Sequence, residues 1–160
     1  MASAGAQVRA VAAEIVDAVI TGGRSLDAAI TDNESCVSSN DRSLLRMLCY
    51  GVLRHHWQLE GWASELLARP LKRKDSVINA LLSVGLYQLS DTRVPDHAAV
   101  SQTVEAARLL RRPRHAGLIN ACLRRFQRDK LARESRLNEE CRWNHPRWLI
   151  DALNRDWPDD

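Results

Sequence analysis

The chain of 160 residues is poor in the residues that build cross-linked or repetitive proteins. It has 7 Gly, 5 Pro and 4 Cys, no two cysteines stand in a CxxC spacing, and aromatic residues make up 5%. These scarcities exclude disulfide scaffolds, collagen-like chains and low-complexity segments. The cysteines (Cys36, Cys49, Cys122 and Cys141) are therefore expected to be free thiols in a reducing cytoplasm.

Long uncharged apolar runs are also missing. The longest one in the apolar middle of the chain covers 15 residues, from Ser76 to Ser90, whereas a membrane span needs about 20. The first twenty residues contain Arg9, Glu14 and Asp17 and so lack the apolar core of a signal peptide. With 45% hydrophobic and 27% charged residues, the sequence predicts one globular domain outside the membrane.

The apolar residues recur at helical spacing, and no segment alternates as a strand does. Helices are expected at 8–20, 26–30, about 40–66, 77–89, about 95–110 and about 114–130, with a loop at 31–40. The segment 77–89 is apolar on all sides, which is typical of a helix at the centre of a bundle; a buried strand is the alternative, and the length favours the helix. Residues 131–143 predict a linker, and 145–155 a last helix.

Charge is the most informative property of the sequence. Residues 108–136 carry 10 basic and 2 acidic groups, a net charge of +8, although the whole chain has only +3. Twenty of its 23 basic residues are arginines, which bind phosphate through a planar fork of donors. Such clustering is typical of polyanion binding, and a solvated polar face is the alternative.

A helical projection of residues 114–130 gives the charge block a geometry. At 100° per residue, Leu118, Ile119, Cys122, Leu123 and Phe126 share one side, and the arginines lie beside it. We predict that this side, the end of the preceding helix and a basic trio further upstream bind RNA. The candidate residues are Arg108, Arg111, Arg112, Arg114, Asn120, Arg124, Arg125, Arg128, Lys72, Arg73 and Lys74. Free amides at the helix start, residues 114–117, are expected to help.

Signatures of catalysis are missing from the chain. There is no GxSxG, no HExxH and no pair of glycines separated by one residue. The pairs Cys49–His55 and His115–Cys122 do not supply four converging zinc ligands, so no metal site is expected.

Two segments resemble a known family. The run 94–126 is similar to the two-helix core of the NusB-like domain, and 41–54 to its long third helix. The tail 143–153, WNHPRWLIDAL, resembles the entry segment of bacterial ribosomal RNA cytosine-C5 methyltransferases of the Sun/Fmu type. The residues that match the core pattern are Pro95, Glu105, Gly117, Ile119, Asn120, Leu123 and Arg124, and those of the third helix are Asp41, Arg42, Leu48, Gly51 and Arg54.

The resemblance implies an all-α, NusB-like bundle of about seven helices in two packed subbundles that helps hold small-subunit ribosomal RNA. It divides the chain into an RNA-binding domain at 1–130, a linker at 131–143 and the start of a linking subdomain at 144–160. It also implies a catalytic domain in which a cysteine attacks C6 of cytosine and S-adenosylmethionine methylates C5. The family's nucleophile follows Pro or Thr, unlike any cysteine here, so we expect neither catalytic residue nor cofactor site in this chain.

The expected partners are therefore ribosomal RNA and the chain's own C-terminal methyltransferase domain, in the cytoplasm. A protein-interaction module of NusB type and an intramolecular docking domain are the alternatives. One departure concerns the first helix, where free-standing relatives often carry an arginine pair and this chain has only Arg9. That difference favours RNA binding through the arginines of residues 108–128.

Overall fold

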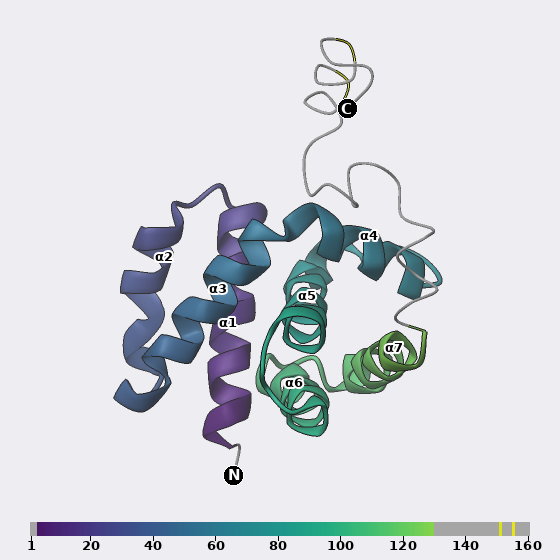
Figure 1. Ribbon diagram of the computed structural model, residues 1–160. Helices are drawn as coiled ribbons and strands as arrows, with labels where there is room; N and C mark the ends of the chain where they lie inside the picture. Colours follow the sequence, from purple (N-terminus) through teal and green to yellow (C-terminus); the bar gives the residue numbers. More distant parts are fainter. Residues whose placement is uncertain (1–2, 130–150, 152–154, 156–160) are drawn as a thin grey trace.

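The computed structural model describes residues 3–129, 151 and 155. Within them the chain is helical without strands, as expected (Figure 1). Seven α-helices follow one another, with short 3-10 turns before α3, α5 and α7. They are α1 (Ala4–Ile20), α2 (Leu26–Asn33), α3 (Arg42–Arg54), α4 (His56–Leu66), α5 (Ser76–Asp91), α6 (Asp96–Leu109) and α7 (Ala116–Arg128).

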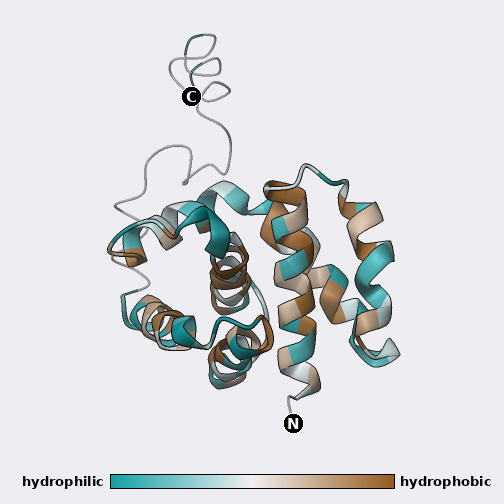
Figure 2. Cartoon of the chain, turned by 180° about the vertical axis from the view of Figure 1, so that it is seen from behind, coloured by the Kyte–Doolittle hydropathy of each residue, from teal (hydrophilic) through white to brown (hydrophobic). Residues whose placement is uncertain are grey.

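The helices form two groups, α1 to α3 and α4 to α7, which meet where α1 packs against α5 and α6 (Figure 1). Helix α5 contacts α1, α3, α4, α6 and α7, so it is the central helix predicted from its apolar residues. In Figure 2 apolar residues occupy the inner sides of the helices. The fully buried side chains of α5 include Ile78, Leu81, Leu82 and Leu86, and burying each one contributes about 1.5–3 kcal/mol.

One predicted helix is wrong in length. The segment expected as a single helix at about 40–66 is two helices, because the backbone leaves helical geometry at His55, with φ −103° and ψ 21°. The apolar spacing continues across this break and conceals it. Trp62 of α4 can therefore pack edge-on against Phe126 of α7, with ring centroids 4.9 Å apart.

Other boundaries differ by a few residues. Helix α1 begins at Ala4, where the Ser3 hydroxyl accepts from the amide of Ala6, and α2 begins after a Ser25 cap, as predicted. The expected loop at 31–40 contains the end of α2 and two 3-10 turns. The predicted linker at 131–143 lies outside the described residues, as does most of the predicted last helix; Asp151 and Arg155 are helical.

A polar network crosses the core between the two groups of helices. Arg9 of α1, 4% exposed, donates from Nε to Oε1 of Gln88 at 2.8 Å and from Nη1 to the Gly5 carbonyl at 2.8 Å. Gln88 donates in turn to the Thr103 hydroxyl of α6 at 3.2 Å. Burial lowers the pKa of Arg9, against the opposing effect of Asp41. Since Arg9 lies inside the fold, α1 presents no arginine to RNA there.

Candidate nucleic-acid interface

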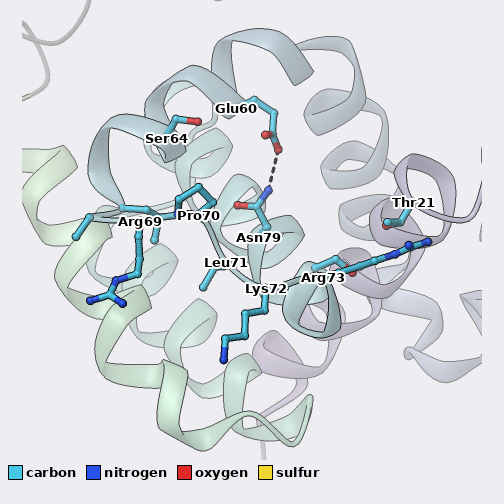
Figure 3. A pocket seen from close by; sticks show the side chains of 12 residues that line it. Thr21, Glu60, Ser64, Arg69, Pro70, Leu71, Lys72, Arg73 and Asn79 are labelled. Carbon is cyan, nitrogen blue, oxygen red and sulfur yellow. Dashed lines mark hydrogen bonds between the residues drawn. The ribbon is translucent and has the colours of Figure 1, made fainter.

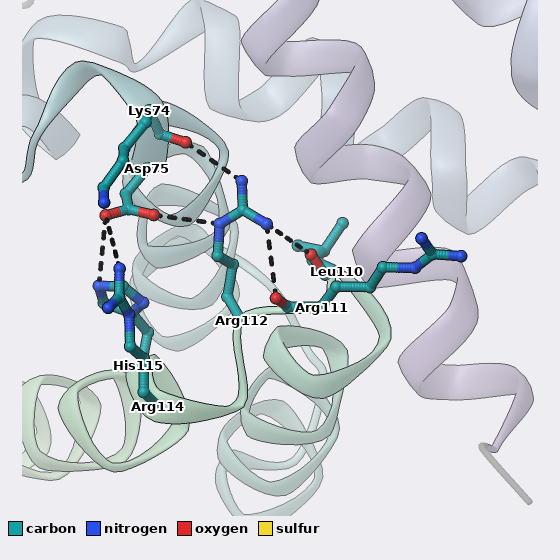
Figure 4. Close-up of polar contacts among 7 residues, drawn as sticks. All are labelled: Lys74, Asp75, Leu110, Arg111, Arg112, Arg114 and His115. Atoms are coloured by element: carbon teal, nitrogen blue, oxygen red, sulfur yellow. Dashed lines mark hydrogen bonds and ion pairs between the residues drawn. The ribbon is translucent and has the colours of Figure 1, made fainter.

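A single carboxylate organises the most basic part of the described surface. Asp75 ends the 3-10 turn at Arg73–Asp75, directly before α5, and is 4% exposed. An aspartate at this position usually caps its own helix, but this side chain makes no capping hydrogen bond. Its two oxygens face the α6–α7 connection, which follows in the sequence more than 30 residues later (Figure 4).

Arg112 ties that connection to the start of α5. Its Nε donates to Oδ1 of Asp75 at 3.0 Å and its Nη2 to the Lys74 carbonyl at 3.2 Å. Its Nη1 donates to the carbonyls of Leu110 and Arg111, each at 3.4 Å. All three guanidinium nitrogens thus have partners inside the protein. Arg112 was predicted to contact RNA, and the structure gives it a role in holding the two segments together.

Arg114 and His115 approach the other carboxylate oxygen. Nη2 of Arg114 lies 3.8 Å from Oδ2 of Asp75, and Nε2 of His115 lies 3.7 Å from the same atom. The Arg114 side chain is 68% exposed, whereas that of His115 is 13% exposed. The buried Nδ1 of His115 has no hydrogen-bond partner among the described residues. Arg114 is therefore the most exposed member of this cluster.

The structure brings together two basic runs that the sequence shows separately. We call the combined surface the basic corner; its residues are Lys72, Lys74, Arg111, Arg112 and Arg114, and Arg73 of the same basic run lines another hollow. Four of the five are exposed and Arg112 is half-buried. Lys74, Arg111, Arg112 and Arg114 line a hollow of about 320 Å³. The basic trio, which was weak support for an interface when considered alone, thus adjoins the main charge block.

A groove runs between the α4–α5 loop and the start of α7. Its volume is about 340 Å³; half-buried Leu67, Leu71 and Leu118 provide apolar lining, and Arg69, Lys72, Lys74 and Arg114 provide charge. A second hollow of about 370 Å³ lies against the same loop, where Glu60 accepts from Asn79 at 2.9 Å (Figure 3). In that view Arg73 extends toward Thr21 and away from Lys72.

The remaining predicted residues lie on α6 and α7. The buried side of α7 consists of Ala116, Ile119, Cys122, Leu123 and Phe126, and its three arginines are exposed. Arg124 and Arg128 are one turn apart on the outer side, beyond half-buried Asn120. Arg125 lies 3.9 Å from Asp129, and Arg108 pairs with Glu105 at 2.8 Å. The three arginines of α7 begin about 15 Å along the chain axis from Arg114, which precedes that helix, so they form a separate basic strip.

The prediction that free backbone amides at residues 114–117 help to bind RNA is wrong at two positions. Residues 113–115 form a 3-10 turn, in which the amide of His115 donates to the Arg112 carbonyl at 2.9 Å. The amide of Ala116 donates to the Pro113 carbonyl. Both amides are therefore engaged inside the turn.

A family model identifies the kind of domain. The model described as "NusB family" matches residues 6–128 of the chain. The chain belongs to the NusB family. Its NusB-family residues include both runs of the basic corner and all of α7.

Several curated relatives of this NusB-family chain carry the name "Ribosomal RNA small subunit methyltransferase B". The protein from Klebsiella pneumoniae subsp. pneumoniae is 43% identical over 153 residues, which are 95% of this chain and 36% of the relative. Those from Yersinia pseudotuberculosis serotype O:1b and Erwinia tasmaniensis are 41% identical over 152 residues, 94% of this chain and 35% of each relative. The chain thus spans about a third of the length of these relatives.

Sequence reasoning missed Asp75, His115 and Arg69. The signal available for Asp75 was a single acid between a basic trio and an apolar helix, a pattern that usually marks an exposed helix start. In the part of the NusB-family chain that the structure describes, no three metal-binding side chains converge. Nor is any helix in that part long and apolar enough to cross a membrane.

Proposed function

We propose that this NusB-family domain helps hold small-subunit ribosomal RNA for an S-adenosylmethionine-dependent cytosine-C5 methyltransferase. The basic corner carries the proposal, because cations from two distant parts of the sequence adjoin on one surface. Neutralising RNA phosphates releases condensed counterions, which favours binding. The name of the relatives supplies the class of RNA and methyl transfer, whereas cytosine C5 and S-adenosylmethionine are what the resemblance of the tail implies.

The groove beside the corner favours single-stranded RNA. Unpaired bases need an apolar or aromatic surface, and their phosphates need cations close by. Leu67, Leu71 and Leu118 offer the first, and Lys72 and Arg114 the second. We propose that a base lies against the leucines while the flanking phosphates contact the two cations.

The described residues do not fit S-adenosylmethionine or the nucleophile. They contain no strand and therefore no Gly-rich strand–loop of the kind that the resemblance implies. Burial raises the pKa of Cys49 to about 12, and burial also raises the pKa of Cys122, so both thiols stay protonated. We therefore propose that methyl transfer belongs to a separate C-terminal domain, linked through 131–143 and a subdomain that starts at 144. A ribosomal RNA substrate supports a location in the cytoplasm, which is part of this proposal.

Filter binding of the 160-residue chain to fragments of small-subunit ribosomal RNA tests the proposal. Affinity should fall with salt, by a slope of about 0.7 per phosphate contact if single strands are bound. Reversing two groove charges, Lys72→Glu with Arg114→Glu, should weaken binding at least about tenfold. Arg24→Glu with Arg42→Glu, two exposed residues of the α1–α3 group, is the matched control and should change it much less.

Two results would contradict the proposal. One is binding that is absent or independent of salt. The other is an equal loss in the groove and control variants, which would show that only net charge matters. Arg124→Glu with Arg128→Glu then measures how far the strip on α7 contributes. If groove reversal spares RNA but abolishes binding to a separately produced catalytic domain, the corner is an intramolecular docking surface.

A further inference from the structure

The basic corner has a negative charge at its centre. The carboxylate of Asp75 is 5% exposed and lies between Arg112, Arg114 and His115 (Figure 4). A carboxylate beside a phosphate-binding surface weakens binding through simple repulsion. If charge alone mattered, a neutral residue at position 75 would serve better.

The geometry gives the two oxygens of Asp75 different tasks. Oδ1 accepts from Arg112, whose other nitrogens are bonded to three carbonyls, so the carboxylate is held in one orientation. Oδ2 is thereby aimed at the two groups that border the groove, Arg114 and His115. Arg114 is 68% exposed and makes no hydrogen bond among those that the structure describes. Without this charge its long side chain would sample many rotamers.

We propose that Asp75 is a positioning residue for RNA binding, which holds the Arg114 guanidinium at the groove with the His115 ring beside it. This inference rests on the proposed function. A guanidinium that is already placed loses less side-chain freedom when it meets a phosphate. The benefit of an ordered Arg114 exceeds the repulsion from one carboxylate.

The substitution Asp75→Asn separates positioning from charge by the sign of its effect. Removing a negative charge about 8 Å from a phosphate in water should strengthen binding about twofold. Losing one charge-assisted contact should weaken it about tenfold. We expect weaker binding by filter assay and a salt slope smaller by about one phosphate contact, although the protein has become more positive. Equal or tighter binding would overturn the inference.

Glu105→Gln is the matched control, since it also removes a carboxylate paired with an arginine, Arg108, on the surface. It should leave affinity unchanged or raise it up to about twofold. A double-mutant cycle adds a measurement that a merely structural role would not affect. In an Arg114→Gln background, Asp75→Asn should no longer weaken RNA binding. If the two losses are additive, Asp75 does not act through Arg114.

A comparison of two exposed arginines covers the case in which Asp75→Asn does not fold. Arg114→Gln should weaken RNA binding more than Arg128→Gln, because Arg114 lies 3.8 Å from the Asp75 carboxylate, whereas no ion pair is described for Arg128. Equal losses would overturn the positioning role. Failure of the unsubstituted chain to bind RNA would instead refute the proposed function, so the two failures are distinguishable.

Discussion

Arg111 occupies a backbone conformation that suits glycine. Its φ is +60°, and among the described residues it is the one non-glycine with a positive φ. It follows the last turn of α6, where its amide donates to the Arg108 carbonyl and the next amide, of Arg112, to the Ala107 carbonyl, both at 3.0 Å. This is a Schellman ending, whose left-handed position is usually glycine. After α1 the comparable positive φ, +67°, belongs to Gly23.

Arg111→Gly should therefore stabilise the fold. The left-handed region destabilises a residue with a Cβ by about 1–2 kcal/mol, and glycine relieves this strain. The greater conformational freedom of glycine in the unfolded chain offsets about 0.5–1 kcal/mol of the gain. A net gain of about 0.5–1 kcal/mol remains. With an unfolding entropy of about 2.1 cal/mol/K per residue, Tm should rise by about 2–4 °C for a folded part of this size.

The same substitution should weaken RNA binding, because the exposed Arg111 side chain belongs to the basic corner. Loss of one phosphate contact lowers the salt slope by about 0.7. Thermal unfolding followed by circular dichroism and filter binding measure the two effects on one protein. Arg111→Ala is the control: it should lose the same affinity without gaining stability. An unchanged or lower Tm for Arg111→Gly would refute the strain argument, and unchanged affinity would remove Arg111 from the interface.

Three further predictions concern the core. Gly51→Ala should destabilise the protein by about 1–3 kcal/mol or more in urea unfolding, because its Cβ would lie 2.0 Å from a Tyr87 ring carbon. Arg9→Met should cost about 1–3 kcal/mol, because it leaves the buried Gln88 oxygen without its donor; RNA affinity, measured below the melting range, should not change. Folding raises the pKa of Cys49 from 9.0 to about 12. The protonated thiol therefore makes its full contribution to the free energy of unfolding below pH 9, and this contribution is lost as the pH rises toward 12. The urea midpoint should fall over that range, and less steeply in Cys49→Ala; equal slopes would contradict the assignment.

The helices were predictable because burial repeats along the sequence. Val77–Leu89 has almost no polar side, and it does form the central α5. The break between α3 and α4 was not predictable, since His55 is neither Gly nor Pro and the apolar spacing continues through it. The bend depends on packing at a distance: Gly51 lets Tyr87 of α5 approach α3, and His55 stacks on the same ring with centroids 5.9 Å apart.

The basic surface was predictable as a set of charges and not as an arrangement. A helical projection placed the α7 arginines beside a buried side, which the structure confirms. It could not show that Lys72 and Lys74 lie beside Arg114, because that proximity arises from tertiary packing. Asp75 was missed for the same reason: its burial depends on Arg112, a residue on another helix connection.

The pairing of Asp75 with Arg112 also sets when the chain can acquire the affinity for RNA that we propose. During synthesis, residues 72–74 emerge well before the residues that complete the surface. The start of α5 can pair with Arg112 only after the connection that follows α6 has been synthesised. A nascent chain that ends before Arg114 offers only a scattered positive charge. Affinity for a defined RNA should thus appear late and abruptly in a series of C-terminal truncations, which makes RNA binding a reporter of completed folding.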